Sequence, residues 1–160
     1  MVVIVMGPSG AGKSTIGLAL ADALGWEFLE GDDFHPQSNV DKMHRGEPLD
    51  DRDRAPWLAR LATEIRARLA ASTDTVLACS ALKRAYRAQL VVDARVRLVN
   101  LRASPELLAA RLAARHDHFM PPSLLASQLQ TLEPPTDAID IDASQPLDAI
   151  VEELRRRLSR

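Results

Sequence analysis

Short runs of apolar residues alternate with longer amphipathic stretches along this chain. A continuous apolar run predicts a strand buried on both faces, and apolar residues three and four positions apart predict a helix. Because the two patterns alternate, the sequence predicts an α/β fold in which helices cover both faces of a parallel sheet. The predicted strands are Val2–Met6, Trp26–Glu30, Thr75–Cys79, Val96–Leu101 and Ala138–Ile141.

Local signals mark several ends of the predicted helices. Gly25 can close the first helix, Pro56 fits the first turn of the third, and Ser104 caps the fourth. No internal repeat or low-complexity linker interrupts the pattern, so residues 1–160 are expected to form one domain. The predicted helices are Lys13–Leu24, Pro36–Arg45 and, approximately, residues 56–69, 104–115, 121–132 and 147–158.

Composition narrows the classes of protein that remain. The formal net charge of the 160 residues is −2, so no broad basic surface is available for nucleic acid. The single cysteine, Cys79, excludes an internal disulfide framework and fits a reducing compartment. No apolar run reaches the roughly 20 residues that a membrane-spanning helix needs. A cytoplasmic location and no contact with membranes are therefore expected.

The segment GPSGAGKS, residues 7–14, fits the phosphate-loop pattern G-x-x-x-x-G-K-[ST]. Its glycines let backbone N–H groups converge on phosphate oxygens at the positive end of the following helix. Lys13 would reach the β- and γ-phosphates of ATP, and Ser14 would bind Mg²⁺. A chance match in a glycine-rich turn is the alternative, but a buried strand before the motif and a helix after it argue against chance. The expected nucleotide contacts are Gly7, Ser9, Gly10, Ala11, Gly12, Lys13, Ser14 and Thr15.

The second predicted strand ends in EGDDFHP, which places Asp32 beyond the carboxyl end of a strand. Sites of parallel sheets lie there, so Asp32 is expected near the phosphate loop, as a general base or as a carboxylate that holds Mg²⁺ through water. Helix capping by Asp32 or Asp33 before Pro36 is the alternative reading. The third strand ends without an aspartate, which points to Asp32 as the Mg²⁺-linked acid and disfavours GTPase switches and motors.

Two basic clusters are candidates for anion binding. Lys83, Arg84 and Arg87 follow the third strand and could receive an anionic substrate, although exposed helical arginines are common. Arg111 and Arg115 are four residues apart on one helix face and could clamp the triphosphate, although an exposed basic face would look the same. His116 and His118, close by, have no further ligands at zinc spacing, so no metal site is expected there.

Five segments together resemble a known family. They read GPSGAGKS, GDDFHP, NVDKMHRGEPLDDRDRAPWL, CSALKRAYR and HFMPPSLLASQLQTLEPP, and they extend from about residue 4 to residue 146. This set resembles gluconokinases of the short phosphate-loop type, and the middle three segments are specific because the fold alone does not dictate them. The resemblance implies a five-stranded kinase fold, ATP-dependent phosphorylation of D-gluconate at its 6-hydroxyl, a helical lid over about residues 111–125 and a homodimer.

The resemblance also implies roles for individual residues. Asp32 would be the base, Arg111 and Arg115 would be lid arginines, and the loop Asp142–Pro146 would cradle adenine, with Asp142 a nucleotide contact. The acceptor region would cover about residues 32–58 and later segments. Its substrate contacts would be Asp32, His35, Lys42, Arg54, Ser80, Lys83, Arg87 and His118.

Two positions depart from the family pattern. Asp117 stands where glycine is usual, which puts the backbone freedom of the lid in question. Pro8 stands where a small aliphatic residue is common and cannot donate a backbone hydrogen bond to phosphate.

Two alternatives to gluconate phosphorylation remain at this stage. The chain could phosphorylate another small sugar acid or a polyol. It could also be a regulatory module that binds a nucleotide and makes no phosphorylated product, although the polar acceptor segments and the arginine pair argue against that class.

Overall fold

The computed structural model describes residues 1–115 and 122–160. None of the helices in these two ranges is long and apolar enough to cross a bilayer. The strands are β1 (Val2–Met6), β2 (Glu27–Glu30), β3 (Thr75–Ala78), β4 (Val96–Arg102) and β5 (Ile139–Asp142). The helices are α1 (Lys13–Leu24), α2 (Gln37–His44), α3 (Asp51–Ala70), α4 (Arg84–Leu90), α5 (Pro105–Ala113), α6 (Pro122–Thr131) and α7 (Leu147–Leu158), with a short 3₁₀ helix, η1 (Gly31–Phe34).

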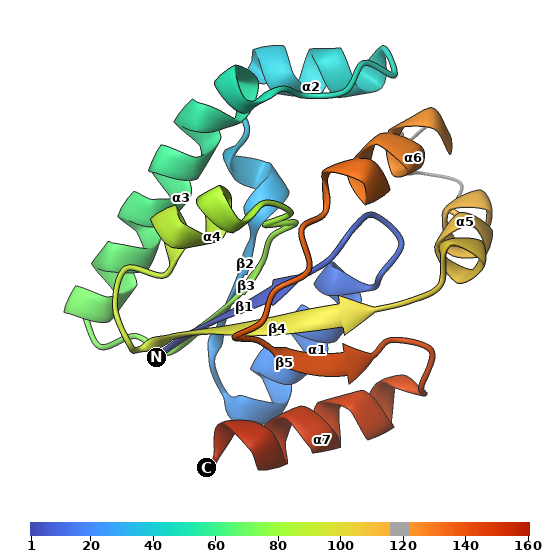
Figure 1. The fold of residues 1–160 in the computed structure, drawn as a ribbon. Coiled ribbons are helices and arrows are strands. Elements are labelled where there is room, and N and C mark those ends of the chain that lie inside the picture. The colour runs from blue at the N-terminus through green and yellow to red at the C-terminus, as the bar shows by residue number, and fades with distance from the viewer. Residues whose placement is uncertain (116–121) are drawn as a thin grey trace.

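All five strands are parallel and follow the order β2-β3-β1-β4-β5 (Figure 1). From β1 the chain goes to β2 and β3 on one side of the sheet, and it then crosses β1 to reach β4 and β5 on the other side. The direction of the connections therefore reverses beside β1. Ligands bind beyond the carboxyl ends of strands at such a point, because the loops diverge and leave a crevice. The loops after β1, β2 and β3 therefore meet at one edge of the sheet.

The side chains of β1 alternate between two hydrophobic cores. Val2, Ile4 and Met6 pack with residues of α3 and α4, whereas Val3 and Val5 pack with residues of α1 and α7. Figure 1 shows α1 and α7 on one face of the sheet and α3 and α4 on the other. This burial on both faces explains why β1 is continuously apolar. Cys79, directly after β3, is 1% exposed within the first of these cores.

The predicted parallel sheet is confirmed, but the predicted start of the third helix at Pro56 is wrong. Helix α3 begins five residues earlier, at Asp51. Asp50 and Asp53 form a reciprocal capping box, in which each carboxylate accepts a hydrogen bond from the other residue's backbone N–H. This cap satisfies the first turn, so Pro56 lies in the second turn and removes one helical hydrogen bond without ending the helix.

Helix α4 has no counterpart among the predicted helices. It is only seven residues long, and Tyr86 and Leu90 are the buried apolar pair, one turn apart. A helix this short has too few apolar positions for a helical period to be recognised, and Lys83, Arg84 and Arg87 interrupt the apolar pattern. Its position matters, because Arg87 donates to the loop after β3 and the Tyr86 hydroxyl accepts from Arg54 in the first turn of α3.

Candidate active site

The loop between β1 and α1 has the backbone geometry that phosphate binding requires. Gly10 has a φ of 88°, and a side chain there would lie 2.9 Å from the Leu108 carbonyl oxygen. Gly12, with a φ of 94°, is the N-cap of α1 and offers no side chain to its first N–H groups. Those N–H groups and the positive end of α1 are therefore free to face an anion.

A hydrogen bond between Lys13 and Pro8 joins the two ends of this loop. The Lys13 ammonium donates to the Pro8 carbonyl, with Nζ and O 3.1 Å apart, and the Ala11 N–H donates to the same oxygen. Proline at position 8 thus supplies the acceptor of the turn through its carbonyl, a role that requires no N–H. Burial lowers the pKa of Lys13, whereas the carboxylates of Asp32 and Glu30 oppose that shift. A charged Lys13 in this position attracts phosphate strongly.

Glu30, at the end of β2, is a site residue that the sequence analysis did not single out. Its carboxylate accepts a hydrogen bond from the Ser14 hydroxyl, and burial raises its pKa. Glu30 is therefore nearer than Asp32 to the predicted metal-binding hydroxyl. The signal was present, since Glu30 ends the second predicted strand at the same edge as the phosphate loop.

The residues around Ser14 fit a magnesium ion. One hydroxyl and the carboxylates of Glu30 and Asp32 are hard oxygen donors. In the two described ranges, no three His, Cys, Asp or Glu side chains are grouped closely enough to hold a metal ion. Mg²⁺ suits such a site, because it keeps several waters and takes further ligands from phosphate oxygens.

A cleft adjoins the phosphate loop and contains four of the residues predicted to bind substrate: Asp32, His35, Arg54 and Ser80. Ser9 and Lys13 form its phosphate-side wall, so a molecule in the cleft would lie next to the bound phosphates. The other lining residues are Met43, Glu47, Pro48, Leu49, Trp57, Leu82, Leu124, Ser127 and Gln128.

Trp57 fixes the wall that carries Asp32. Its indole N–H donates to the Gly31 carbonyl at 2.8 Å, and its ring stacks on His35 with centroids 4.2 Å apart. Gly31 is required here, because a side chain would lie 2.4 Å from the Ala78 carbonyl oxygen. The 3₁₀ turn that carries Asp32 is therefore held against β3 on one side and Trp57 on the other.

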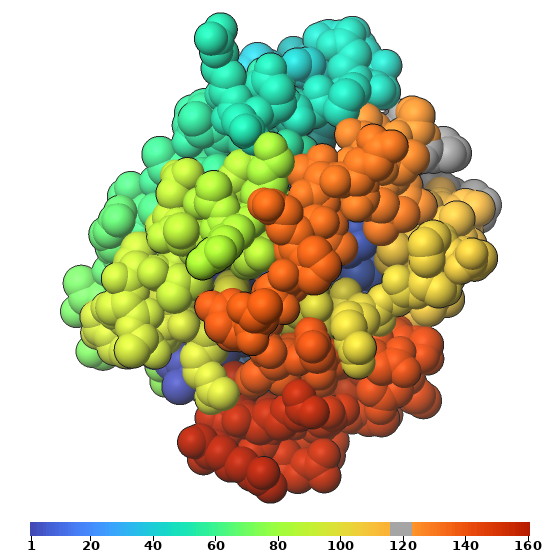
Figure 2. All heavy atoms as spheres, in the orientation of Figure 1, coloured from blue at the N-terminus to red at the C-terminus, as the bar shows by residue number. Residues whose placement is uncertain are grey.

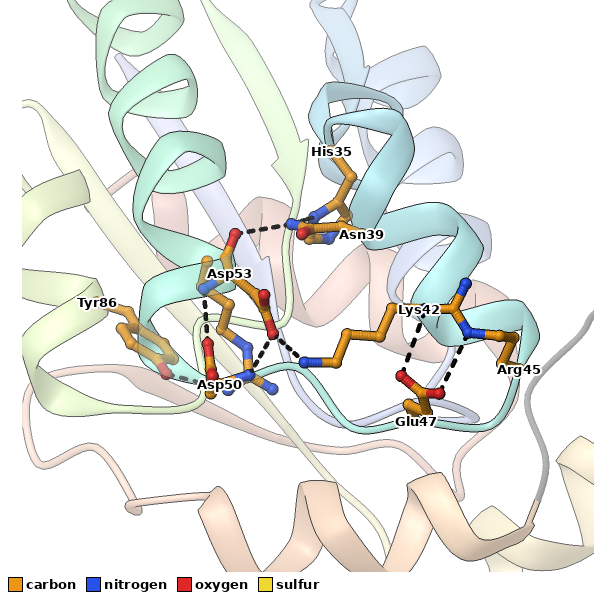
Figure 3. Close-up of polar contacts among 9 residues, drawn as sticks. His35, Asn39, Lys42, Arg45, Glu47, Asp50, Asp53 and Tyr86 are labelled. Carbon is orange, nitrogen blue, oxygen red and sulfur yellow. Dashed lines mark hydrogen bonds and ion pairs between the residues drawn. The ribbon is translucent and has the colours of Figure 1, made fainter.

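Lys42 and Lys83 do not line the cleft. Lys42 donates to the Asp53 carboxylate at 2.7 Å, as Figure 3 shows. Lys83 donates to the Asp51 carboxylate at 2.8 Å. Both ammonium groups are thus paired with acids near the start of α3, outside the cleft wall.

Arg87 also lies outside the cleft, and its guanidinium is buried against backbone carbonyls. It donates to the carbonyl oxygens of Ala81, Leu82 and Glu133 at 2.9, 3.1 and 2.8 Å. Ala81 has a φ of 45°, a left-handed conformation that alanine adopts at a cost of about 1–2 kcal/mol. Arg87 stabilises this turn, which in turn presents Ser80 to the cleft.

Replacement of Arg87 by methionine is expected to lower the free energy of unfolding by about 3 kcal/mol, because three carbonyls lose a charged donor. The melting temperature should fall by about 6–12 °C, which thermal unfolding measures. Arg84→Met, at an exposed position of the same helix, is the matched control and should change it little. An unchanged melting temperature with a raised KM for the acceptor would instead assign Arg87 to substrate binding.

A second cavity opens on the other side of the phosphate loop. Arg111 bridges its walls by donating to the carbonyl oxygens of Gly10, Ala11 and Ala143 at 3.4, 3.3 and 2.6 Å. The lining residues are Gly10, Gly12, Thr15, Ile16, Arg111, Ala114, Arg115, Ala143, Gln145, Leu147 and Ile150. This set contains both predicted lid arginines and Thr15, and its apolar part suits a flat ring.

Asp142 does not line this cavity. Its carboxylate accepts hydrogen bonds from the N–H and hydroxyl of Ser144, which lower its pKa. Asp142 therefore shapes the turn from which Ala143 and Gln145 face the cavity. The nucleotide contact predicted for Asp142 stays a prediction.

Helix α6 contacts the phosphate loop through Gln128, another residue missed from the sequence. Its side-chain oxygen accepts a hydrogen bond from the Ser9 N–H at 2.8 Å. Figure 2 shows atoms of the N-terminal segment, coloured blue, in the gap between α5 and α6. Gln128 belongs to a segment that carried the family resemblance, but its type alone gave no role. His118 and Asp117, named in the sequence analysis, lie outside the described residues.

Known proteins are similar to this chain in sequence and in fold. A family model described as an AAA domain matches residues 2–135. Among curated proteins, a gluconokinase of Gluconobacter oxydans (strain 621H) is 49% identical over 157 residues, covering 96% of this chain and 88% of the relative.

Solved structures agree with this match. A sugar kinase from Janibacter sp. HTCC2649 superposes with a TM-score of 0.92 at 44% identity, over 99% of this chain and 94% of the other. A gluconokinase from Sinorhizobium meliloti 1021 does so with a TM-score of 0.87 at 46% identity, over 99% and 91%. The fold and the two adjoining sites define a phosphate-loop kinase. With relatives this similar over nearly their whole length, the chain belongs to the gluconokinase family.

Proposed function

We propose that this protein transfers the γ-phosphoryl group of ATP to the 6-hydroxyl of D-gluconate, giving 6-phospho-D-gluconate and ADP. The observation that carries the proposal is the wall shared by the two sites. Lys13 and Ser9 of the phosphate loop line the same cleft as Asp32 and Arg54. A hydroxyl in that cleft would lie between a carboxylate and the bound triphosphate.

Arg54 is the group we assign to the gluconate carboxylate. Among the described residues that line the cleft, the lysine and arginine side chains are Lys13 and Arg54, and Lys13 belongs to the phosphate loop. Arg54 is oriented by Tyr86, to whose hydroxyl it donates at 3.0 Å and over whose ring it lies at 5.5 Å. A guanidinium can bind a carboxylate through two parallel hydrogen bonds, which fixes the orientation of the sugar acid.

Asp32 receives the proton of the acceptor hydroxyl as its oxygen forms the bond to phosphorus and the bond to the ADP oxygen breaks. Lys13, with Arg111 and Arg115 from the other side of the loop, offsets the negative charge on the transferring group. Ser14 and Glu30, with Asp32 through water, would hold Mg²⁺, which would supply positive charge beside the phosphate oxygens.

Coupled detection of ADP across a panel of sugar acids and polyols tests the proposal. D-gluconate should give the highest kcat/KM, and the product should carry phosphate on carbon 6 by phosphorus–proton coupling. Lys13→Met is the inactive control. Faster turnover of another acid, or no release of ADP with any of them, would contradict the proposal.

Replacement of Glu30 by glutamine is expected to raise the Mg²⁺ concentration for half-maximal turnover about tenfold. The Mg²⁺ site would lose either a negatively charged oxygen ligand or the carboxylate that accepts a hydrogen bond from Ser14. Turnover at fixed ATP across a Mg²⁺ titration measures this. The matched control is Glu27→Gln on the same strand, whose carboxylate pairs with Arg68 instead. Identical titrations for Glu30→Gln and the unchanged protein would exclude Glu30 from the metal site.

The homodimer and the cytoplasmic location that the sequence suggests stay predictions. Light scattering on the purified protein tests the first, since a dimer has twice the mass of the 17.6 kDa chain. Fractionation of cells that express the protein tests the second.

A further inference from the structure

Asn39 lies in α2, behind the cleft wall rather than in it. Asn39 is 2% exposed, and its side-chain nitrogen has two neighbours (Figure 3). One is the Asp53 carbonyl oxygen at 2.8 Å, and the other is Nδ1 of His35 at 3.1 Å. A buried amide linked to both the first turn of α3 and a histidine of the cleft can determine how that ring is protonated.

The identity of the amide atoms follows from the Asp53 contact. A backbone carbonyl only accepts hydrogen bonds, so the group of Asn39 that faces it must be the NH₂. The same NH₂ meets Nδ1 of His35, and an amide nitrogen only donates. Nδ1 must therefore be an unprotonated acceptor, which leaves the proton of the neutral ring on Nε2.

The surroundings of His35 favour the neutral ring. Its side chain is 4% exposed and stacks on Trp57. Burial lowers the pKa of His35, with Arg54 acting in the same direction and Asp32 opposing. Nε2 lies 3.9 Å from a carboxylate oxygen of Asp32, which is longer than a hydrogen bond but close enough for electrostatic attraction.

We propose that Asn39 is a positioning residue, which fixes the His35 tautomer with its Nε2–H directed at the Asp32 carboxylate. The proposal rests on the proposed function, in which Asp32 is the base. The side chain of Asp32 is 62% exposed and has few neighbours to restrain its rotation. A fixed N–H dipole beside it attracts the carboxylate into one orientation without delivering a proton to it.

The alternative tautomer would reverse this effect. With the proton on Nδ1, the Nε2 lone pair would face the carboxylate and repel it. The Asp53 carbonyl prevents the amide of Asn39 from rotating to accept from Nδ1, because rotation would set two oxygens against each other. The tautomer is thus tied to the start of α3, whose capping box holds Asp53 in place.

The test combines nitrogen NMR of the histidine rings with kinetics. The chain has four histidines, and His35→Gln assigns the signal of interest. We expect Nε2 to be protonated in the unchanged protein, and Asn39→Asp to reverse the tautomer because a carboxylate accepts from Nδ1–H. In that variant kcat should fall about tenfold or more, while KM for ATP stays within about twofold.

Gln37→Leu is the matched control. Gln37 also lies in α2, and its amide bonds to exposed Asp41 at 2.9 Å. The Gln37→Leu variant should leave both the His35 tautomer and kcat unchanged. A general loosening of α2 would affect this variant and Asn39→Asp alike.

Three results would overturn the proposal: Nδ1–H in the unchanged protein, an unchanged tautomer in Asn39→Asp, or a reversed tautomer with unchanged kcat. The first requires no variant, so the proposal can be refuted even where Asn39→Asp does not fold. The ring spectrum requires no substrate either. Failure of the gluconate assay with the expected tautomer present would therefore contradict the proposed function alone. In that case, kcat would be measured with the acceptor that gives the fastest ATP turnover in the panel.

Discussion

Replacement of Asp32 by asparagine is expected to lower kcat by about 10²–10⁴-fold, the range typical of a lost general base. Asparagine has the same shape but cannot take the proton of the acceptor hydroxyl at neutral pH. The affinity for ATP should change little, because the phosphate loop and Arg111 remain in place. Steady-state kinetics with D-gluconate, together with ATP binding by calorimetry, measures both quantities.

Asp33→Asn is the matched control, since it makes the same change one residue later in η1, outside the cleft lining. It should keep nearly normal turnover. If both variants were equally slow, the loss would come from a general disturbance of η1 and not from a missing base. Near-normal turnover of Asp32→Asn would remove Asp32 from the role of base.

Replacement of Trp57 by alanine is expected to lower the free energy of unfolding by about 3–5 kcal/mol. The variant loses a side chain that is 1% exposed, the stack on His35 and the hydrogen bond to Gly31. The melting temperature should fall by about 6–20 °C, which calorimetry or circular dichroism measures. Trp26→Ala, at the half-buried second tryptophan, should cost less.

Trp57→Phe separates packing from positioning. Phenylalanine keeps most of the apolar contact and the aromatic face but cannot donate to the Gly31 carbonyl. A modest loss of about 1–3 kcal/mol is expected, together with reduced turnover, because the turn that carries Asp32 is less restrained. Unchanged stability and turnover in this variant would show that the indole N–H does not hold the turn.

The central strands could be predicted from sequence because β1 and β3 are short, almost wholly apolar runs, as burial on both faces requires. The edge strands β2 and β5 read EFLE and IDID, so their apolar signal was weaker. The start of α3 could not be predicted, since the capping box of Asp50 and Asp53 looked like part of a charged loop. The cleft residues Asp32, His35, Arg54 and Ser80 were found because they follow strands or belong to the resembling segments.

Cations were harder to assign from sequence. A lysine or arginine beside a predicted site looks the same whether it faces a substrate or a group of its own chain. Lys42 and Lys83 pair with acids, and Arg87 binds three carbonyls, whereas Arg54 lines the cleft. The partners that decide this come from distant segments, such as Glu133 for Arg87. Gln128 was missed for the same reason, because its partner Ser9 is 119 residues away.

The buried position of Cys79 makes it a natural reporter of unfolding. Burial raises the pKa of its thiol to about 12, so very little thiolate exists at neutral pH while the fold is intact. Alkylating reagents attack the thiolate, and they therefore modify this single thiol only when the core around β3 opens. The rate of labelling, compared with that of the unfolded chain, gives the free energy of that opening without an added probe.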